Sequence, residues 1–228
     1  MYITMLIEIP ALLSKKKLSE IQQILAQAQF VDGKLSAGMA AKRVKNNAEL
    51  PPDAQQLERL NTLVMSTLVQ HPLFQNAALP HRVASPFYAR YEQGQTYGEH
   101  IDDPVMGPAG QRYRSDISCS VFLNSPEDYA GGELQIKTQY GSQDIKLAAG
   151  SAILYPSNSL HQVLPVLSGT RLVAVTWIQS MIRQAERREL LFELNQARES
   201  LMREQADSEV THQVDHSYVN LIRMWSEI

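Results

Sequence analysis

The part of the chain from Phe87 to Gln179 consists of short segments rich in β-branched and aromatic residues, separated by Gly, Pro, Asn and Asp. This texture is typical of an antiparallel sandwich or barrel. Because the strands are short and numerous, we expect a jelly roll. The expected strands are Phe87 to Tyr91, Asp116 to Leu123, Glu133 to Lys137, Asp144 to Leu147, Ser151 to Tyr155, Leu160 to Val166 and Arg171 to Gln179.

Helical periodicity flanks this region on both sides. Apolar residues recur every three or four positions from Ser14, a potential N-cap, to about Phe30, and again from Asp53 to about Val69. After the strands, the same period covers residues 182–201 and 210–225, with a break at 206–209. The predicted fold class is therefore mainly β with flanking helices (α+β), a jelly-roll core with N-terminal and C-terminal helices.

A chain of 228 residues is long enough for one large β domain with helical additions. Neither an internal repeat nor a low-complexity linker divides it. We therefore expect one domain over residues 1–180, with its jelly-roll core at about 84–180. Residues 181–228 are expected to form a C-terminal helical extension packed on that core.

Composition narrows the possible partners and compartment. The net charge of -3, with acidic and basic residues mixed along the chain, indicates neither a nucleic-acid nor a membrane partner. Cys119 is the single cysteine, so no intramolecular disulfide can form, which fits a reducing cytoplasm. Residues 1–13 are apolar but contain Glu8 and Pro10 and are followed by lysines, so we expect a strand there instead of a signal peptide. No uninterrupted apolar run of about 18 residues is present, so no transmembrane helix is predicted.

One pair of residues in the β region can bind a metal. His100 and Asp102 are two positions apart, and alternation along a strand would direct both side chains to the same face. His161 lies on a later predicted strand that a rolled sheet could bring opposite this pair. A His-x-Asp pair with a distant His is the ligand set of 2-His-1-carboxylate Fe(II) sites, which leave coordination positions open for substrate and oxygen.

Arg171 follows His161 by ten residues through a Gly-Thr turn, so we expect it on the neighbouring antiparallel strand, near the same cavity. A guanidinium binds a carboxylate through two parallel hydrogen bonds. A small dicarboxylate could therefore chelate iron at one end and pair with Arg171 at the other. The compound 2-oxoglutarate has this shape.

The arrangement of these residues resembles the catalytic domain of prolyl 4-hydroxylases and, more closely, the bacterial PKHD-type hydroxylases. That resemblance covers nearly the whole chain, including Val44-Lys45-Asn46-Asn47 and the end of the chain at Arg223-Met224-Trp225-Ser226-Glu227. The core of the pattern is Tyr91, Gly94, Tyr97, His100-x-Asp102, Gly131-Gly132-Glu133-Leu134, Pro156, His161, Pro165, Gly169 and Arg171.

The resemblance implies a double-stranded β-helix fold and a dioxygenase that uses Fe(II), 2-oxoglutarate and O2. It also implies oxidative decarboxylation of 2-oxoglutarate to succinate, coupled to hydroxylation of a substrate C–H bond, with L-ascorbate as a reductant and a link to iron uptake. Two departures stand out. Many prolyl hydroxylases have lysine where Arg171 stands, and the aromatic residue that often assists the distal carboxylate falls here among Ser120, Val121 and Phe122. Tyr91 and Tyr155 are our candidates for the assisting hydroxyl.

Several other residues have competing interpretations. Asp103 is adjacent to Asp102, but alternation turns it to the opposite face. His212 and His216 are four residues apart on a predicted helix, where a surface pair is favoured over a zinc site because no third ligand is evident. Gly131-Gly132 is expected to form a turn with positive φ. The apolar stripes of the last helices could pack on the sheet or form a homodimer contact.

Two other functions compete with the dioxygenase. One is a non-catalytic jelly-roll sensor that binds iron and 2-oxoglutarate, and the complete set of ligands and anchor argues against it. The other is a cupin-type isomerase, which would use a His-x-His pair with a glutamate, so that Asp102 argues against it. The primary substrate is not readable from the sequence, and a protein, a small metabolite or a siderophore-like molecule could each reach the site.

Overall fold

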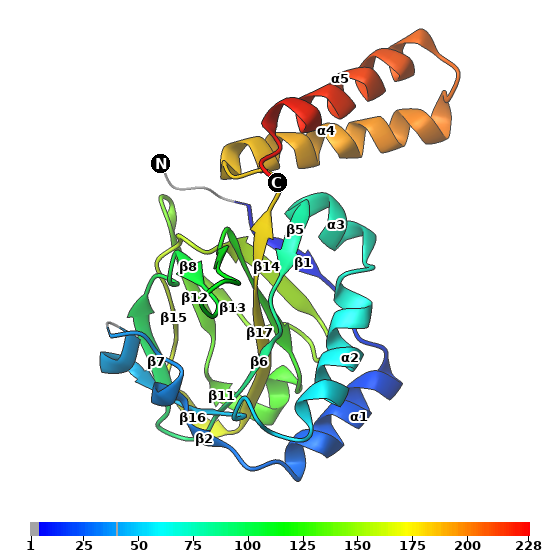
Figure 1. The fold of residues 1–228 in the computed structure, drawn as a ribbon. Coiled ribbons are helices and arrows are strands. Elements are labelled where there is room, and N and C mark those ends of the chain that lie inside the picture. The colour runs from blue at the N-terminus through cyan, green and yellow to red at the C-terminus, as the bar shows by residue number, and fades with distance from the viewer. Residues whose placement is uncertain (1–4, 40) are drawn as a thin grey trace.

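Two antiparallel sheets face each other at the centre of the computed structural model, which describes residues 5–39 and 41–228 (Figure 1). The larger sheet has the order β1 (Ile7–Ile9), β14 (Ala152–Pro156), β10 (Ile117–Phe122), β17 (Arg171–Ser180), β6 (Phe87–Tyr91), β4 (Ala48–Glu49) and β2 (Val31–Asp32), with β5 (Pro80–Val83) also pairing with β17. The smaller sheet has the order β13 (Gly141–Ile145), β12 (Leu134–Thr138), β15 (His161–Val163), β7 (Thr96–His100) and β3 (Lys45–Asn46). Two short ribbons, β11 (Tyr129–Gly131) with β16 (Val166–Gly169) and β8 (Val105–Met106) with β9 (Tyr113–Arg114), complete the β structure.

Each expected strand corresponds to one observed strand, and β6 has the predicted bounds. Strand β13 covers Gly141–Ile145 instead of Asp144 to Leu147, and the strand expected within residues 1–13 is β1, with residues 1–4 outside the described part of the chain. The segment from Leu160 to Val166 is the exception, because it divides between β15 and β16. Pro165 lies at the division and has no backbone N–H to donate to a ladder. The predicted class, a mainly β jelly-roll core with N-terminal and C-terminal helices, is confirmed.

Three helices cover the outer face of the larger sheet (Figure 1): α1 (Lys15–Ala26), α2 (Leu57–Leu68) and α3 (Pro72–Ala78). Ser14 caps α1 as expected, because its hydroxyl accepts a hydrogen bond from the backbone N–H of Lys17. The sequence did not predict α3, whose N-cap is His71. The apolar faces of these helices pack with residues of the outer sheet face in one cluster, which includes Ile21, Leu25, Leu60, Val64, Leu68, Phe74, Cys119, Val121 and Ala174.

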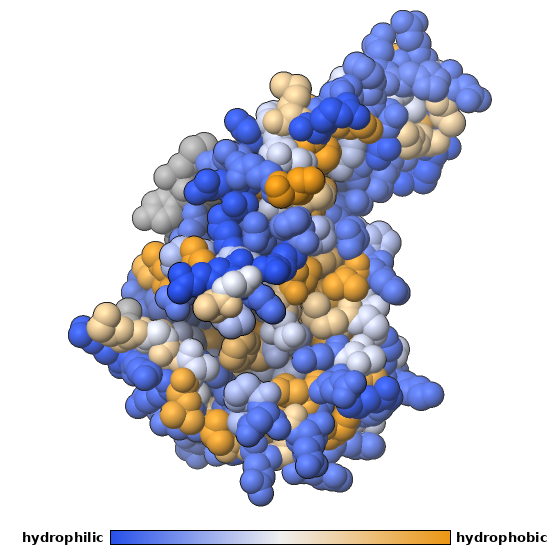
Figure 2. Space-filling model, in the orientation of Figure 1, coloured by the Kyte–Doolittle hydropathy of each residue, from blue (hydrophilic) through white to orange (hydrophobic). Residues whose placement is uncertain are grey.

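The chain ends in a helical hairpin formed by α4 (Ala185–Glu204) and α5 (Glu209–Trp225), which projects away from the sheets (Figure 1). Its base packs on the body through a cluster that includes Leu79, Ile182, Leu191 and Trp225. Hydrophobic residues gather near this base, whereas the distant end is hydrophilic (Figure 2). No helix in the described part of the chain is long and apolar enough to cross a membrane.

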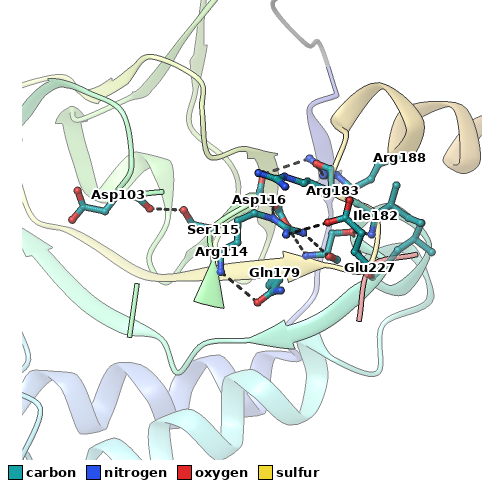
Figure 3. A network of polar contacts seen from close by, with 11 residues as sticks. Asp103, Arg114, Ser115, Asp116, Gln179, Ile182, Arg183, Arg188 and Glu227 are labelled. Carbon is teal, nitrogen blue, oxygen red and sulfur yellow. Dashed lines mark hydrogen bonds and ion pairs between the residues drawn. The ribbon is translucent and has the colours of Figure 1, made fainter. Parts of the chain in front are cut away.

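Polar contacts fix the hairpin to the start of β10 (Figure 3). The buried Arg188 of α4 donates to the backbone carbonyls of Ile182 and Arg183 at 2.8 and 2.9 Å, and reaches the carbonyl of Asp116 at 3.5 Å. Arg114 binds the carboxylate of Asp116 at 2.7 Å and lies 3.5 Å from that of Glu227. The hairpin is therefore anchored on the strand that begins next to the site described below.

Candidate active site

Three potential metal ligands converge between the two sheets. The ligand atoms of His100, Asp102 and His161 all lie within 4.8 Å of one another. Oδ1 of Asp102 is 3.8 Å from Nε2 of each histidine, and all three side chains are at most 9% exposed. His161 pairs with His100 across β15 and β7, so the sheet brings residues far apart in sequence into direct proximity.

Hydrogen bonds at Nδ1 orient both imidazoles. Nδ1 of His100 is 2.8 Å from the carbonyl oxygen of Gly98, and Nδ1 of His161 is 2.9 Å from that of Ser159. A carbonyl can only accept, so Nδ1 is the donor in each contact, and in the neutral form of the ring Nε2 then has a free lone pair. Burial, followed by the proximity of His161, lowers the pKa of His100 to about 4, which favours the neutral ring that metal binding requires.

Asp102 does not lie on the strand that carries His100. The sequence argument placed both residues on one strand, but β7 ends at His100 and Asp102 lies in the loop that follows. The side chains nevertheless converge, because hydrogen bonds from the start of β10 hold this loop. Ser118 donates to Oδ2 of Asp102 at 2.5 Å, and the hydroxyl of Ser115 donates to the carbonyl of Asp103.

The same three residues line a cavity of about 680 Å³, which Arg171 also lines. Arg171 was expected on the strand next to His161, and that detail is wrong. Its strand, β17, belongs to the larger sheet and pairs with β10, β6 and β5, whereas His161 is on the smaller sheet. Since the two sheets face each other, Arg171 reaches the cavity from the side opposite His161.

The guanidinium of Arg171 is a buried charge with two nitrogens that lack hydrogen-bond partners among the described residues. The residue is 1% exposed, and neither Nε nor Nη1 has a hydrogen-bond partner among the described residues. Its Cζ lies 5.0 Å from the centre of the Tyr91 ring and 5.7 Å from that of Phe122, so aromatic faces surround it. A buried cation without a counter-ion is costly, and a bound carboxylate would remove the cost.

Tyr129 is a residue that the sequence argument missed. Its buried hydroxyl makes no hydrogen bond of regular geometry, and Arg171 is near enough to oppose the rise in the pKa of this phenol that burial causes. Phe122, by contrast, packs near the guanidinium without any hydroxyl. The pair Gly131-Gly132 could have indicated that this segment lies close to Arg171. Both φ angles are positive, and a Cβ on Gly132 would lie 3.2 Å from Cδ of Arg171, so glycine is needed for the close approach of the backbone.

The two tyrosines named from the sequence both line the cavity. Tyr91 is opposite Arg171 in the ladder between β6 and β17. The ring of Tyr155 lies 5.1 Å from that of His161 in an edge-on arrangement. Burial raises the pKa of Tyr91 to about 12 and that of Tyr155 well above its usual value. Both phenols therefore remain hydrogen-bond donors at neutral pH.

The residues with competing interpretations lie as follows. Asp103 is exposed, lines the outer cavity and does not belong to the ligand group. His212 and His216 belong to no group of three potential ligands in the described ranges. Gly131 and Gly132 have the expected positive φ. Lys45 forms a buried ion pair with Glu49 at 2.5 Å in the cavity wall.

The residues present fit both an iron ion and a 2-oxoglutarate molecule. Two imidazoles and one carboxylate form the donor set of Fe(II) oxygenases, which leaves positions open for other ligands. The buried guanidinium of Arg171, with two nitrogens that lack hydrogen-bond partners among the described residues, supplies the cation that a dicarboxylate needs in the same cavity. A volume of about 680 Å³ is within the range that holds drug-sized ligands, so room remains for part of a substrate.

Comparison with known proteins agrees with this site. The sequence profile of the 2OG-Fe(II) oxygenase superfamily matches residues 86–179, and that of the PKHD-type hydroxylase C-terminal domain matches residues 186–227. A PKHD-type hydroxylase of Thioalkalivibrio sulfidiphilus is 50% identical over 98% of this chain and 100% of its own length.

Two solved structures share the fold at low sequence identity. A prolyl hydroxylase of Trichoplax adhaerens, in complex with a hypoxia inducible factor peptide, has a TM-score of 0.56 at 19% identity, covering 82% of this chain and 86% of its own. A prolyl-4-hydroxylase of Pseudomonas putida has a TM-score of 0.53 at 17% identity, covering 77% and 92%.

The sequence matches define a 2-oxoglutarate-dependent Fe(II) oxygenase, and the two solved structures agree with it in fold. Within that class, the chain belongs to the family of PKHD-type hydroxylases. It is therefore an enzyme that uses Fe(II), 2-oxoglutarate and O2 in a hydroxylation reaction.

Proposed function

We propose that His100, Asp102 and His161 hold the catalytic iron and that Arg171 binds the distal carboxylate of 2-oxoglutarate. The observation that carries this proposal is that a His-Asp-His group and a buried guanidinium line one cavity from opposite sides, and that two nitrogens of this guanidinium lack hydrogen-bond partners among the described residues. Iron bound there supplies the site at which oxygen is activated for hydroxylation.

The chain's own residues perform binding, orientation and exclusion of water in this account. The carbonyls of Gly98 and Ser159 hold the two imidazoles with Nε2 directed at the metal position. The sheets bury the inner cavity, where electrostatic interactions are stronger than in water. Arg171 fixes the orientation of the co-substrate. The protonated phenols of Tyr91 and Tyr155 line the cavity and are available as donors to it, whereas the phenol of Tyr129 lies beside Arg171 and could assist through that side chain.

The outer cavity admits the primary substrate in this proposal. Its lining includes Asp103 and an aromatic pair in which Phe87 packs edge-on against Trp177, with ring centres 5.6 Å apart. We further propose that L-ascorbate keeps the iron reduced, that the protein acts in the cytoplasm and that its reaction serves iron homeostasis. The proposals on ascorbate and iron homeostasis rest on the family resemblance, and the proposal on the cytoplasm rests on the single cysteine, Cys119.

The domain division and oligomeric state are also proposals. We propose that residues 1–180 act as the dioxygenase domain and that residues 181–228 form a helical extension packed on it, which the separate profile match at 186–227 supports. Leu190 and Val219, on α4 and α5, are 51% and 40% exposed, and we propose the hairpin as the contact of a homodimer.

Uncoupled turnover tests the proposed function against the non-catalytic sensor. Purified protein given Fe(II), ascorbate, O2 and 2-oxoglutarate is expected to form succinate slowly even without a primary substrate. The measurement is succinate by mass spectrometry, with a sample lacking Fe(II) as control. Tight binding of 2-oxoglutarate without any succinate, also in the presence of cell extract, would favour the sensor.

The Tyr129→Phe variant tests the assisting hydroxyl. Loss of a hydrogen bond to a charged group costs about 1.5–3 kcal/mol, so the affinity for 2-oxoglutarate is expected to fall about tenfold or more. Tyr140→Phe is the matched control, because Tyr140 is 83% exposed in the turn between β12 and β13. Calorimetric titration of 2-oxoglutarate into the anaerobic, metal-loaded proteins measures the difference. If Tyr129→Phe binds 2-oxoglutarate as tightly as the parent, the hydroxyl that assists Arg171 must come from Tyr91 or Tyr155.

A further inference from the structure

The carboxylate of Asp102 has a partner that the ligand set does not include. Ser118, on β10, is 0% exposed, and its hydroxyl donates to Oδ2 of Asp102 at 2.5 Å. The other carboxylate oxygen, Oδ1, is the one that lies 3.8 Å from Nε2 of both histidines. Ser118 therefore holds one oxygen of Asp102 and leaves the other directed at the metal position.

A second buried serine extends this contact. The hydroxyl oxygens of Ser157 and Ser118 are 2.8 Å apart, and Ser157 is 2% exposed. A hydroxyl has one hydrogen to donate, and that of Ser118 is directed to a carboxylate that can only accept. Ser157 must then be the donor to Ser118, so the hydrogen bonds run in one direction from Ser157 through Ser118 to Asp102.

The backbone fixes both serines in place. Ser118 pairs with Tyr155 on β14 and with Trp177 on β17, in the middle of the larger sheet. The backbone N–H of Ser157 donates to the carbonyl of Asp116 at 3.1 Å. The loop with Asp102, by contrast, has left β7, so strand pairing does not determine the direction of its carboxylate.

From these contacts we propose that Ser118 and Ser157 form a relay that positions Asp102 as a ligand and thereby sets the affinity of the metal site. The proposal rests on the ligand assignment given above and adds two positioning residues to it. Partners of metal ligands typically change metal affinity by about 10–100-fold when they are removed. The effect of Ser118 should be the larger one, because it contacts the carboxylate directly.

Co(II) is the probe, since it can replace Fe(II) without air oxidation and has a visible absorption spectrum that reports its ligands. In anaerobic titrations, Ser118→Ala is expected to raise the Co(II) dissociation constant about tenfold or more and to change the spectrum. Ser157→Ala is expected to raise it by less. Ser151→Ala is the matched control, because it also removes a buried serine hydroxyl, one that accepts from the N–H of Ala11 and does not line the cavity.

Thermal melting of the metal-free proteins separates positioning from folding. Ser118→Ala and Ser151→Ala should lose similar stability, while only Ser118→Ala loses Co(II) affinity. Co(II) affinity in Ser118→Ala within about twofold of the parent overturns the relay. If Ser118→Ala does not fold, unchanged affinity and spectrum in Ser157→Ala overturn it. Asp102→Ala separates a failure of the relay from a failure of the ligand assignment, because tight Co(II) binding in this variant would refute the assignment of Asp102 as a ligand.

Discussion

The Asp102→Ala variant is expected to lose tight Fe(II) binding and, with it, all oxygen-dependent formation of succinate. Asp102 is the only anionic member of the three-residue group, and its Oδ1 lies between the two imidazoles at 3.8 Å from each. Removing a direct ligand should weaken Fe(II) binding more than removing a hydrogen-bond partner of a ligand does, so we expect the affinity for Fe(II) to fall by more than about 100-fold. Anaerobic titration with Fe(II) measures it.

Asp103→Ala is the matched control for this experiment. It removes the same functional group one residue later, but Asp103 is exposed and does not belong to the ligand group. The contact from Ser115 to this loop is to the backbone carbonyl of Asp103, so it survives the substitution. Equal loss of Fe(II) affinity in the two variants would contradict the assignment of Asp102.

Arg171→Ala is expected to separate co-substrate binding from metal binding. Truncation of one partner of a buried charge pair costs about 2–5 kcal/mol, so the affinity for 2-oxoglutarate should fall roughly thirty-fold or more. Fe(II) affinity should remain close to that of the parent, because Arg171 is on the opposite sheet from His161. Arg171→Lys should recover part of the loss, since an ammonium keeps the charge without the planar fork.

Calorimetric titration of 2-oxoglutarate into anaerobic, Fe(II)-loaded protein measures this effect. Thermal melting with and without 2-oxoglutarate adds an independent readout, because a ligand that binds the folded protein stabilises it. At a fixed concentration, the stabilisation by 2-oxoglutarate should shrink with the logarithm of the lost affinity, separately from the stability lost by truncating a large buried side chain. If Arg171→Ala binds 2-oxoglutarate as tightly as the parent, Arg171 is not the anchor.

The alternation of apolar and polar residues predicted the longer strands of the two sheets and the longer helices that flank them. A strand at β7 was assumed only for the ligand pair, and the short strands β2 to β5 were not predicted. Strand β6 and the two C-terminal helices lie where periodicity placed them. The short helix α3 was missed because seven residues give too little periodicity to recognise. The expected strand from Leu160 to Val166 divides into β15 and β16, and this division was missed. Pro165 interrupts hydrogen bonding only if its N–H position faces a neighbouring strand, and the sequence does not show which strands are neighbours.

Spacing along the chain predicted the potential ligands but not the way in which the fold brings them together. His100 and His161 are opposite each other in one sheet, as a rolled sheet allows. Sheet membership cannot be read from spacing, so Arg171 was placed beside His161 although it faces the cavity from the other sheet.

The polar residues that surround the candidate ligands were the hardest to predict. Ser118 and Ser120 alternate with apolar residues in the buried strand β10, but this pattern alone does not identify Asp102 as the partner of Ser118. Tyr129 approaches Arg171 only because the positive φ angles of Gly131 and Gly132 bring the two segments together. Such contacts depend on tertiary structure and leave only indirect traces in the sequence.

The most direct test of the account is the visible absorption of the anaerobic protein with Fe(II) and 2-oxoglutarate together. A 2-oxo acid chelated to Fe(II) is expected to give a charge-transfer band, which requires both ligands in one cavity. We predict this band at one equivalent of each ligand in the parent, its absence in Asp102→Ala and its appearance in Arg171→Ala only at much higher 2-oxoglutarate concentrations. A band of equal intensity in Asp102→Ala, or no band in a parent protein that binds both ligands, would contradict the account.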